Sequence, residues 1–286
     1  MNVEFYRPFW GAIGTITEIA VQAKAAGFNG LEGHVPEEPG ELQALNQVTK
    51  EHDLKFIPEI CTGGSDPYAY WVPIRSATVD DHIASFESEL KRVQACEMEI
   101  PFINCMGGLD AWSLDDSLRF FEQALSLSDQ YNYLVSFETH RTRCFYSPWS
   151  TYAILQAMPE IPVTTDLSHW CVVSERLIDE EEGLQAVIER AHHIQCRVGY
   201  DQGPQVPQPA APEYERFVSA HQGWWEKIWL SQKERGFETI TMTPEYGSDD
   251  YLHLTPYSKE PVADLWEVVQ WSMQTEQDHF NNFFNN

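Results

Sequence analysis

The chain has 286 residues, of which 43% are hydrophobic, enough to bury the core of one large domain or two average ones. Its formal net charge of −26 weighs against nucleic acid and anionic membranes as partners, because both bind proteins mainly through lysine and arginine. No apolar run reaches the roughly 20 residues that a membrane span needs, and the first residues, MNVEFYRPFW, lack the pattern of a signal peptide.

Short β-rich runs alternate with helical patterns along the chain. The runs lie at 3–6, 29–33, 55–60, 101–106, 133–138, 163–166, 194–199 and 238–243. The clearest helical patterns lie at 15–26, 80–96, 113–127, 148–158, 178–191, 213–235 and 262–273. This alternation predicts an α/β fold, a (β/α)8 TIM barrel formed by residues 1–286 as a single domain. An open doubly wound sheet is the alternative, but RPFWGAIG after the first run lacks the glycine spacing of its phosphate-binding turn.

Two further features bear on the location of the protein and on its loops. The six cysteines show no CxxC spacing and several fall within predicted elements, so we expect reduced thiols and a cytoplasmic protein: Cys61, Cys96, Cys105, Cys144, Cys171 and Cys196. The proline-rich stretch 201–213 follows the seventh predicted strand, where a long loop is typical of a lid or a pocket wall.

Four oxygen-bearing side chains stand at or near the carboxyl ends of the last four predicted strands. They are Glu138, Asp166, Gln195 and Glu245, and the first three are spaced by 28 and 29 residues, about one strand and one helix. In a parallel barrel such positions point into one mouth, where three carboxylates repel each other unless a cation is present. We therefore expect all four to bind a divalent metal, Mg²⁺ or Mn²⁺ rather than Zn²⁺, because an amide oxygen favours hard ions.

Each of these residues also has an ordinary structural interpretation. Glu138 and Glu245 would then be glutamates of a surface loop and a turn, and Gln195 a buried amide bonded to neighbouring backbone. His169, three residues after Asp166, would cap the next helix.

Further polar side chains at the predicted mouth are candidates for substrate binding. His169 and Arg197 follow the sixth and seventh strands, and His193 shares a strand face with Gln195. His140 lies two residues after Glu138, and Glu32 ends the second strand. Aromatic residues also crowd the predicted rim and suit a sugar ring: Tyr6, Phe9, Trp10, Tyr68, Trp71, Trp112, Trp149, Trp170 and Tyr246.

Four motifs resemble the xylose isomerase-like TIM-barrel superfamily, which includes ketose 3-epimerases, hydroxypyruvate isomerases and endonuclease IV. The motifs are FETH at 137–140, DLSHW at 166–170, HIQCRVGY at 193–200 and TPEYG at 243–247. The resemblance implies metal ligands at Glu138, Asp166 and Glu245 and substrate contacts at His169 and Arg197. Gln195 stands where most members have histidine, although the hydroxypyruvate isomerase-like members resemble this chain in using glutamine.

The resemblance implies a metal-dependent isomerase or epimerase of a small sugar or keto-sugar. Glu138 and Glu245 would act as the acid/base pair that moves a carbon-bound proton through an enediolate. The alternatives are a metal-dependent lyase or hydrolase on the same barrel and a non-catalytic sugar-binding barrel. The endonuclease branch needs a basic groove, which the charge of −26 disfavours.

The expected partner is a small carbohydrate, with no nucleic acid and no membrane. The tryptophans of the segment 213–235, Trp224, Trp225 and Trp229, either cover the barrel or form a surface for a homo-oligomer.

Overall fold

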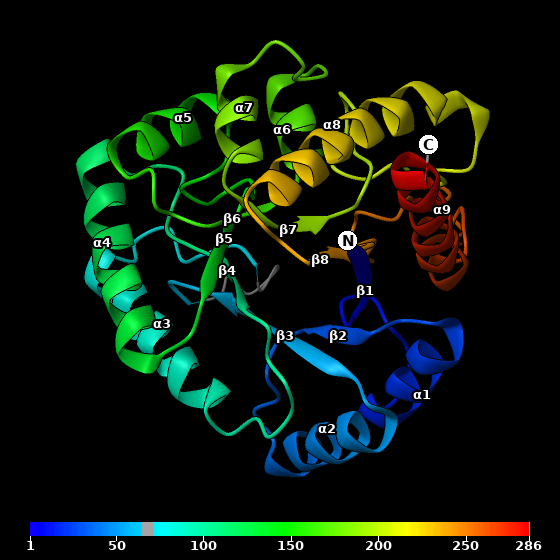
Figure 1. The fold of residues 1–286 in the computed structure, drawn as a ribbon, viewed down its shortest axis with the longest axis horizontal. Helices are drawn as coiled ribbons and strands as arrows, with labels where there is room; N and C mark the ends of the chain where they lie inside the picture. The colour runs from blue at the N-terminus through cyan, green and yellow to red at the C-terminus, as the bar shows by residue number, and fades with distance from the viewer. Residues whose placement is uncertain (65–70, 286) are drawn as a thin grey trace.

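The computed structural model describes residues 1–64 and 71–285 and forms a closed barrel of parallel strands in chain order (Figure 1). The strands are β1 (Asn2–Pro8), β2 (Gly30–Gly33), β3 (Lys55–Cys61), β4 (Ile103–Met106), β5 (Val135–Glu138), β6 (Val163–Thr165), β7 (Ala191–Gln195) and β8 (Thr239–Thr243). β1 pairs with β8, Asn2 opposite Thr239, which closes the ring. The predicted (β/α)8 TIM barrel is confirmed.

Helices surround the barrel on the outside (Figure 1). They are α1 (Ile16–Ala26), α2 (Pro39–His52), α3 (Val79–Val93), α4 (Leu114–Tyr131), α5 (Pro148–Ala157), α6 (Ser168–Ser174), α7 (Glu182–Ile188), α8 (Glu215–Glu234) and α9 (Leu265–Asn285), with a 3-10 turn at Pro212–Tyr214. The sequence patterns missed α2 and α6. They also placed one helix over 178–191, where only Glu182–Ile188 is helical, and ended the last helix at 273 although α9 continues to Asn285.

Local sequence signals explain where several elements begin and end. Thr15 and Glu18 form a capping box at the start of α1, and Gly27 ends that helix at φ 95°, a left-handed conformation that favours glycine. β8 ends at Thr243 because Pro244 has no N–H to donate to a neighbouring strand. Glu245 is thereby released from the sheet at the carboxyl end of the barrel.

The seventh strand differs from its predicted position. The sequence run placed it at 194–199 with Gln195 near its start, but β7 spans Ala191–Gln195 and Gln195 is its last residue. After Gln195, the Cys196 N–H still donates to the Thr243 carbonyl of β8 at 2.7 Å. The backbone then turns away, and the Val206 N–H donates to the Val198 carbonyl. Gln195 therefore ends its strand at the barrel mouth, as Glu138 ends β5.

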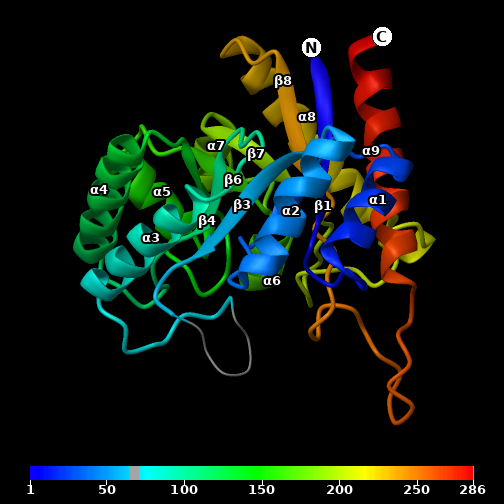
Figure 2. The same ribbon diagram turned by 90° about the horizontal axis from the view of Figure 1, so that it is seen from below.

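The core lies between the barrel and its helices. Trp224, Trp225 and Trp229 of α8 are all buried within this chain, so they cover the barrel and give no support to an oligomer. All six cysteines are free thiols, as predicted. Within the described ranges, no helix combines the length and apolar character that crossing a membrane requires. Figure 2 shows the β8–α9 connection extending beyond the body of the barrel, on the side opposite the two termini.

Candidate active site

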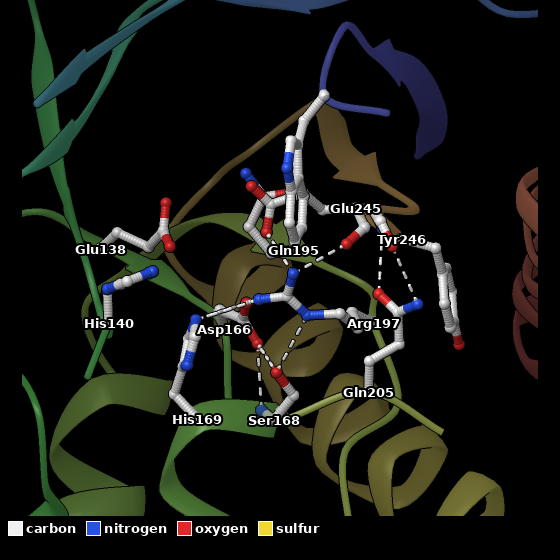
Figure 3. A network of polar contacts seen from close by, with 12 residues as sticks. Glu138, His140, Asp166, Ser168, His169, Gln195, Arg197, Gln205, Glu245 and Tyr246 are labelled. Carbon is white, nitrogen blue, oxygen red and sulfur yellow. Dashed lines mark hydrogen bonds and ion pairs between the residues drawn. The ribbon is translucent and has the colours of Figure 1, made fainter. Parts of the chain in front are cut away.

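The four predicted metal ligands all lie at the carboxyl end of the barrel (Figure 3). Glu138 and Gln195 are the last residues of β5 and β7, Asp166 directly follows β6, and Glu245 lies two residues after β8. All four are buried, with exposed fractions of 0 to 6%. One carboxylate oxygen from each of Glu138, Asp166 and Glu245 lies within 4.8 Å of the others. The strands thus gather three buried carboxylates at one point, as the sequence spacing predicted.

Arg197 lies at the centre of this group (Figure 3). Its guanidinium donates to Asp166 Oδ2 through Nη2, and its Nη1 lies 3.2 Å from Glu245 Oε2 and donates to the Glu245 carbonyl at 2.9 Å. Arg197 therefore offsets part of the negative charge of these three buried carboxylates.

A hydrogen-bonded chain of amides fixes the orientation of Gln195. Its Nε2 donates to Glu32 Oε1 at 2.8 Å, and the same oxygen accepts from Asn104 Nδ2 at 3.2 Å. Asn104 Nδ2 also donates to Glu138 Oε2 at 2.7 Å. With its Nε2 held by Glu32, the Gln195 Oε1 atom is left without a hydrogen-bond partner among the described residues.

Asn104 is a site residue that the sequence analysis missed. It lies in β4 and is completely buried beside Glu32 and Glu138. The signal was a lone amide inside the apolar run PFINCM, at the predicted fourth strand. A buried amide in such a run needs polar partners, which here are the two glutamates.

The unpartnered atoms of the site test whether it fits a metal ion. Glu138 Oε1 and Gln195 Oε1 are buried and accept no hydrogen bond from the described residues, whereas Glu245 Oε2 is paired with Arg197 Nη1 at 3.2 Å. Unsatisfied oxygens of this kind are costly unless a ligand occupies them. Asp166 differs, because Oδ1 accepts from Ser168 N and Oγ and Oδ2 accepts from Arg197. The donor set is nevertheless all oxygen, as hard cations prefer, and it fits a divalent metal.

The pKa values of the carboxylates reflect the same crowding. Burial raises the pKa of Glu138 well above its ordinary value, and the charges of Asp166 and Glu59 raise it further. Burial also raises the pKa of Glu245, against the opposing effect of Arg197. In Arg197 burial lowers the pKa, but Asp166 and Glu245 outweigh it and raise the pKa above its ordinary value.

His140 and His169 line one side of the site with their rings 4.0 Å apart. His169 Nε2 lies 3.4 Å from Asp166 Oδ2 and 3.0 Å from Arg197 Nη2. Burial lowers the pKa of both histidines well below the ordinary value, and the charge of Arg197 lowers it further. Both effects favour the neutral form of these rings. Together with Glu138 the two histidines form a second group of potential ligand atoms, and Arg197 lies beside this group as well as beside Asp166 and Glu245.

Glu32 and His193, both predicted to touch substrate, lie behind Gln195. His193 Nδ1 contacts Thr241 Oγ1 at 2.8 Å, and its Nε2 lies 3.3 Å from Glu32 Oε2. Neither residue lines the cavity at the mouth. Their direct contact with substrate stays a prediction, and their observed contacts are with other site residues.

Aromatic side chains cover the mouth. Trp10, Trp71 and Tyr251 pack edge to face with ring centroids 4.7 to 5.8 Å apart. Beneath them lies a cavity of about 10 Å³ beside Glu59, His140, Arg197 and Glu245, about the space of one water.

The other aromatic residues of the predicted rim have different positions. Trp170 is buried and donates to the Phe145 carbonyl, while Trp149 is 51% exposed. Tyr68 lies outside the described residues.

The predicted pocket wall at 201–213 is fastened to the loop after β8. Gln205 Nε2 donates to the Gly247 carbonyl at 3.2 Å, and the Gly247 N–H donates to Gln205 Oε1 at 2.9 Å (Figure 3). Gln205 is 1% exposed, so this amide pair is shielded from water. The pair holds the backbone two residues after Glu245.

No protein-family model matches the chain, and no curated protein matches it in sequence. Solved structures do match. A D-allulose 3-epimerase from Methylomonas sp., solved with D-allulose, is 10% identical with a TM-score of 0.62 over 97% of each chain. The IolI protein, solved with a zinc atom, is 11% identical with a TM-score of 0.59 over 100% of each chain. Endonuclease IV from Thermus thermophilus is 11% identical with a TM-score of 0.57 over 99% of this chain and 100% of that one.

These similarities confirm, at the level of the fold, the predicted resemblance to xylose isomerase-like TIM barrels. Sugar epimerases are prominent among the similar structures.

Proposed function

We propose that this protein is a divalent-metal-dependent isomerase or epimerase of a small sugar or keto-sugar. The observation that carries the proposal is the convergence of Glu138, Asp166 and Glu245 within 4.8 Å at the barrel mouth. The unpartnered oxygens of Glu138 and Gln195 support metal binding there. The structural similarity to sugar epimerases favours a carbohydrate over other substrates.

In this proposal Glu138, Asp166, Gln195 and Glu245 hold the cation. A bound Mg²⁺ or Mn²⁺ would supply charge that polarises a carbonyl and the neighbouring hydroxyl of the substrate. The barrel contributes the fixed positions of the ligands, because each follows or ends a strand that cannot shift independently.

Glu138 and Glu245 are the proposed acid/base pair. One carboxylate removes a proton from the carbon beside the carbonyl, giving an enediolate, and the other returns it to a neighbouring carbon or to the opposite face. Burial raises the pKa of both carboxylates in the absence of a cation, and a bound cation would oppose that shift and favour the charged base. His169 and Arg197 lie within reach of the same space and would orient substrate oxygens by hydrogen bonds.

The aromatic cover must move for this chemistry to occur. A cavity of about 10 Å³ has no room for a sugar, which is many times larger than a water molecule. Trp10 and Tyr251 lie over Arg197, with ring centroids 5.4 and 5.0 Å from its guanidinium carbon. Displacement of these rings would open the site and leave apolar faces available to the sugar.

The proposal is tested by incubating the protein with ketoses and aldoses in deuterated water with Mn²⁺ and following carbon-bound deuterium by NMR. Isomerase or epimerase chemistry incorporates deuterium at the exchanging carbon. Glu245→Gln should keep the fold but abolish incorporation, and turnover retained by this variant would discard its acid/base role.

Metal analysis separates the alternative functions. Stoichiometric Mn²⁺ or Mg²⁺ together with deuterium exchange supports the isomerase or epimerase. Bond cleavage without exchange would indicate a lyase or hydrolase on the same ligands. A protein that binds sugar but no metal under any condition would be a non-catalytic barrel.

A further inference from the structure

A second and larger cavity lies beside the barrel mouth, between α1, the first turns of α9 and the loop after β8. Its volume is about 740 Å³, within the range of small-molecule sites. Trp10 lines both this cleft and the small cavity over the carboxylates, so the two spaces share a wall. Apolar side chains form most of the lining, among them Leu252, Trp266 and Val269.

Arg7 is the cation of this cleft. It lies in β1, points away from the barrel axis toward α1 and is only 3% exposed. Its Nη1 donates to the Ile19 carbonyl at 2.8 Å and to Gln22 Oε1 at 3.1 Å. The guanidinium carbon lies 4.0 Å from the centroid of the Trp266 ring. The other two guanidinium nitrogens donate to no group in the described part of the chain.

Arg7 also lacks an anionic partner. No carboxylate among residues 1–64 and 71–285 forms an ion pair with it, whereas Arg197 in the barrel contacts two. Burial lowers the pKa of Arg7 to about 10, and no neighbouring acid in these ranges raises it again. A buried, charged and unpaired arginine is unusual in a chain of net charge −26.

The rest of the lining is compatible with an anion beside Arg7. The first residues of α9, Leu265 and Trp266, line the cleft, so the positive end of that helix dipole faces it. Asp264 is the one acid in the described lining, and its Oδ1 is engaged as a cap, accepting from the Glu267 N–H at 3.0 Å. Gln22 and Ser248 add neutral polar groups.

We propose that this cleft binds a small amphipathic carboxylate. The carboxylate would accept hydrogen bonds from the free nitrogens of Arg7, and an aromatic or alicyclic body would pack against Trp266, Leu252 and Val269. A guanidinium matches a carboxylate in a planar, two-point contact, and Trp266 already holds the guanidinium plane in place.

Calorimetric titration with benzoate tests the site, with benzamide as the neutral analogue and acetate as the analogue without a ring. We expect saturable binding of benzoate and at least roughly tenfold weaker binding of the other two, because benzamide lacks the negative charge and acetate lacks the ring. Arg7→Met, which keeps the length of the side chain but not the charge, should weaken benzoate by a similar factor. The matched control is Arg216→Met, on an exposed arginine of α8.

Two further variants keep the test decisive if Arg7→Met fails to fold. Ala263→Trp fills the cleft without changing Arg7 and should abolish benzoate binding. Glu245→Gln alters the barrel mouth and should leave it unchanged, which separates this site from the proposed active site. The proposal would be overturned if benzoate did not bind, if benzamide bound equally well, or if Arg7→Met or Ala263→Trp left benzoate binding unchanged. Loss of benzoate binding in Glu245→Gln would instead assign the ligand to the barrel mouth.

Discussion

At the scale of single residues, the least expected feature is the orientation of Gln195. An amide can present either its oxygen or its nitrogen to a cation, and only the oxygen is a ligand. Glu32 decides between them, because its carboxylate accepts from Gln195 Nε2 and leaves Oε1 free. Glu32 is thus expected to act as a positioning residue, through Gln195.

Glu32→Gln should therefore weaken Mn²⁺ binding by roughly 10- to 100-fold, as loss of a partner that orients a metal ligand commonly does. Calorimetry on the metal-free protein measures this directly, without reference to turnover. Glu37→Gln removes an exposed charge from the connection after β2 and serves as the control. Equal affinities of Glu32→Gln and wild type would contradict the role assigned to Glu32.

Glu276 in α9 gives a pH-dependent prediction away from the site. It is 1% exposed, accepts from Gln222 Nε2 at 3.0 Å, and burial raises its pKa from 4.5 to about 8. The folded protein holds this proton when the unfolded chain has lost it, so the contribution of Glu276 to stability falls as pH rises from 4.5 to about 8.

Glu276→Gln should remove this pH-dependent loss of folding stability, because glutamine has no proton to release. Relative to wild type, the variant should gain stability between about pH 5 and about pH 9, by up to a few kcal/mol since each pKa unit corresponds to about 1.4 kcal/mol. Urea unfolding at the two pH values measures the difference. A difference between variant and wild type that does not change with pH would refute the pKa assignment.

At the scale of elements, the close packing of α5 against α7 depends on a glycine. A Cβ added to Gly183 in α7 would lie 2.1 Å from the Pro148 carbonyl oxygen at the start of α5. That oxygen belongs to the backbone, so one helix would have to shift. Gly183 therefore sets the distance between α5 and α7.

Gly183→Ala should destabilise the protein by roughly 1–3 kcal/mol, the usual cost of overpacking. Gly223→Ala in α8 is the matched change, because a Cβ there meets nothing within 4 Å. It should stabilise by about 0.5–1 kcal/mol through helix propensity alone. Thermal unfolding of both variants measures the contrast, and equal shifts in the same direction would show that the α5–α7 contact is not limiting.

The sequence predicted the carboxylate cluster because its members follow short apolar runs at regular spacing, and parallel strands bring such positions together. It placed Gln195 wrongly within its strand, because the apolar run continues past the point where the backbone leaves the sheet. Glu32 and Asn104 became partners of Gln195 only through closure of the barrel, a contact spanning 163 residues for Glu32 and Gln195. No local pattern encodes such a pairing.

At the scale of the whole molecule, buried carboxylates lie close together at the barrel mouth and repel one another when they are charged. Glu138, Asp166 and Glu245 come from three strands, and burial raises the pKa of each. A cation bound among them would link β5, β6 and β8 and favour the folded state over the unfolded chain.

Mn²⁺ or Mg²⁺ should accordingly raise the unfolding temperature, and a chelator should lower it again. At about 100 times the dissociation constant the gain is about 2.7 kcal/mol, or several degrees for a domain of this size. The double variant Glu138→Gln and Asp166→Asn should show no metal-dependent shift. If no divalent ion changed the unfolding temperature of the wild-type protein, the metal site would be excluded.

The seam between the first and last strands has a consequence for biosynthesis. β1 hydrogen-bonds along Asn2 to Phe5 with β8, so until 239–243 emerge from the ribosome, one flank of β1 has no neighbour to pair with. Glu245 emerges after that segment, and the carboxylate cluster is therefore complete only once the ring can shut. A nascent chain that ends before Thr239 would therefore expose an unpaired strand edge, the kind of surface that favours aggregation until the ring closes.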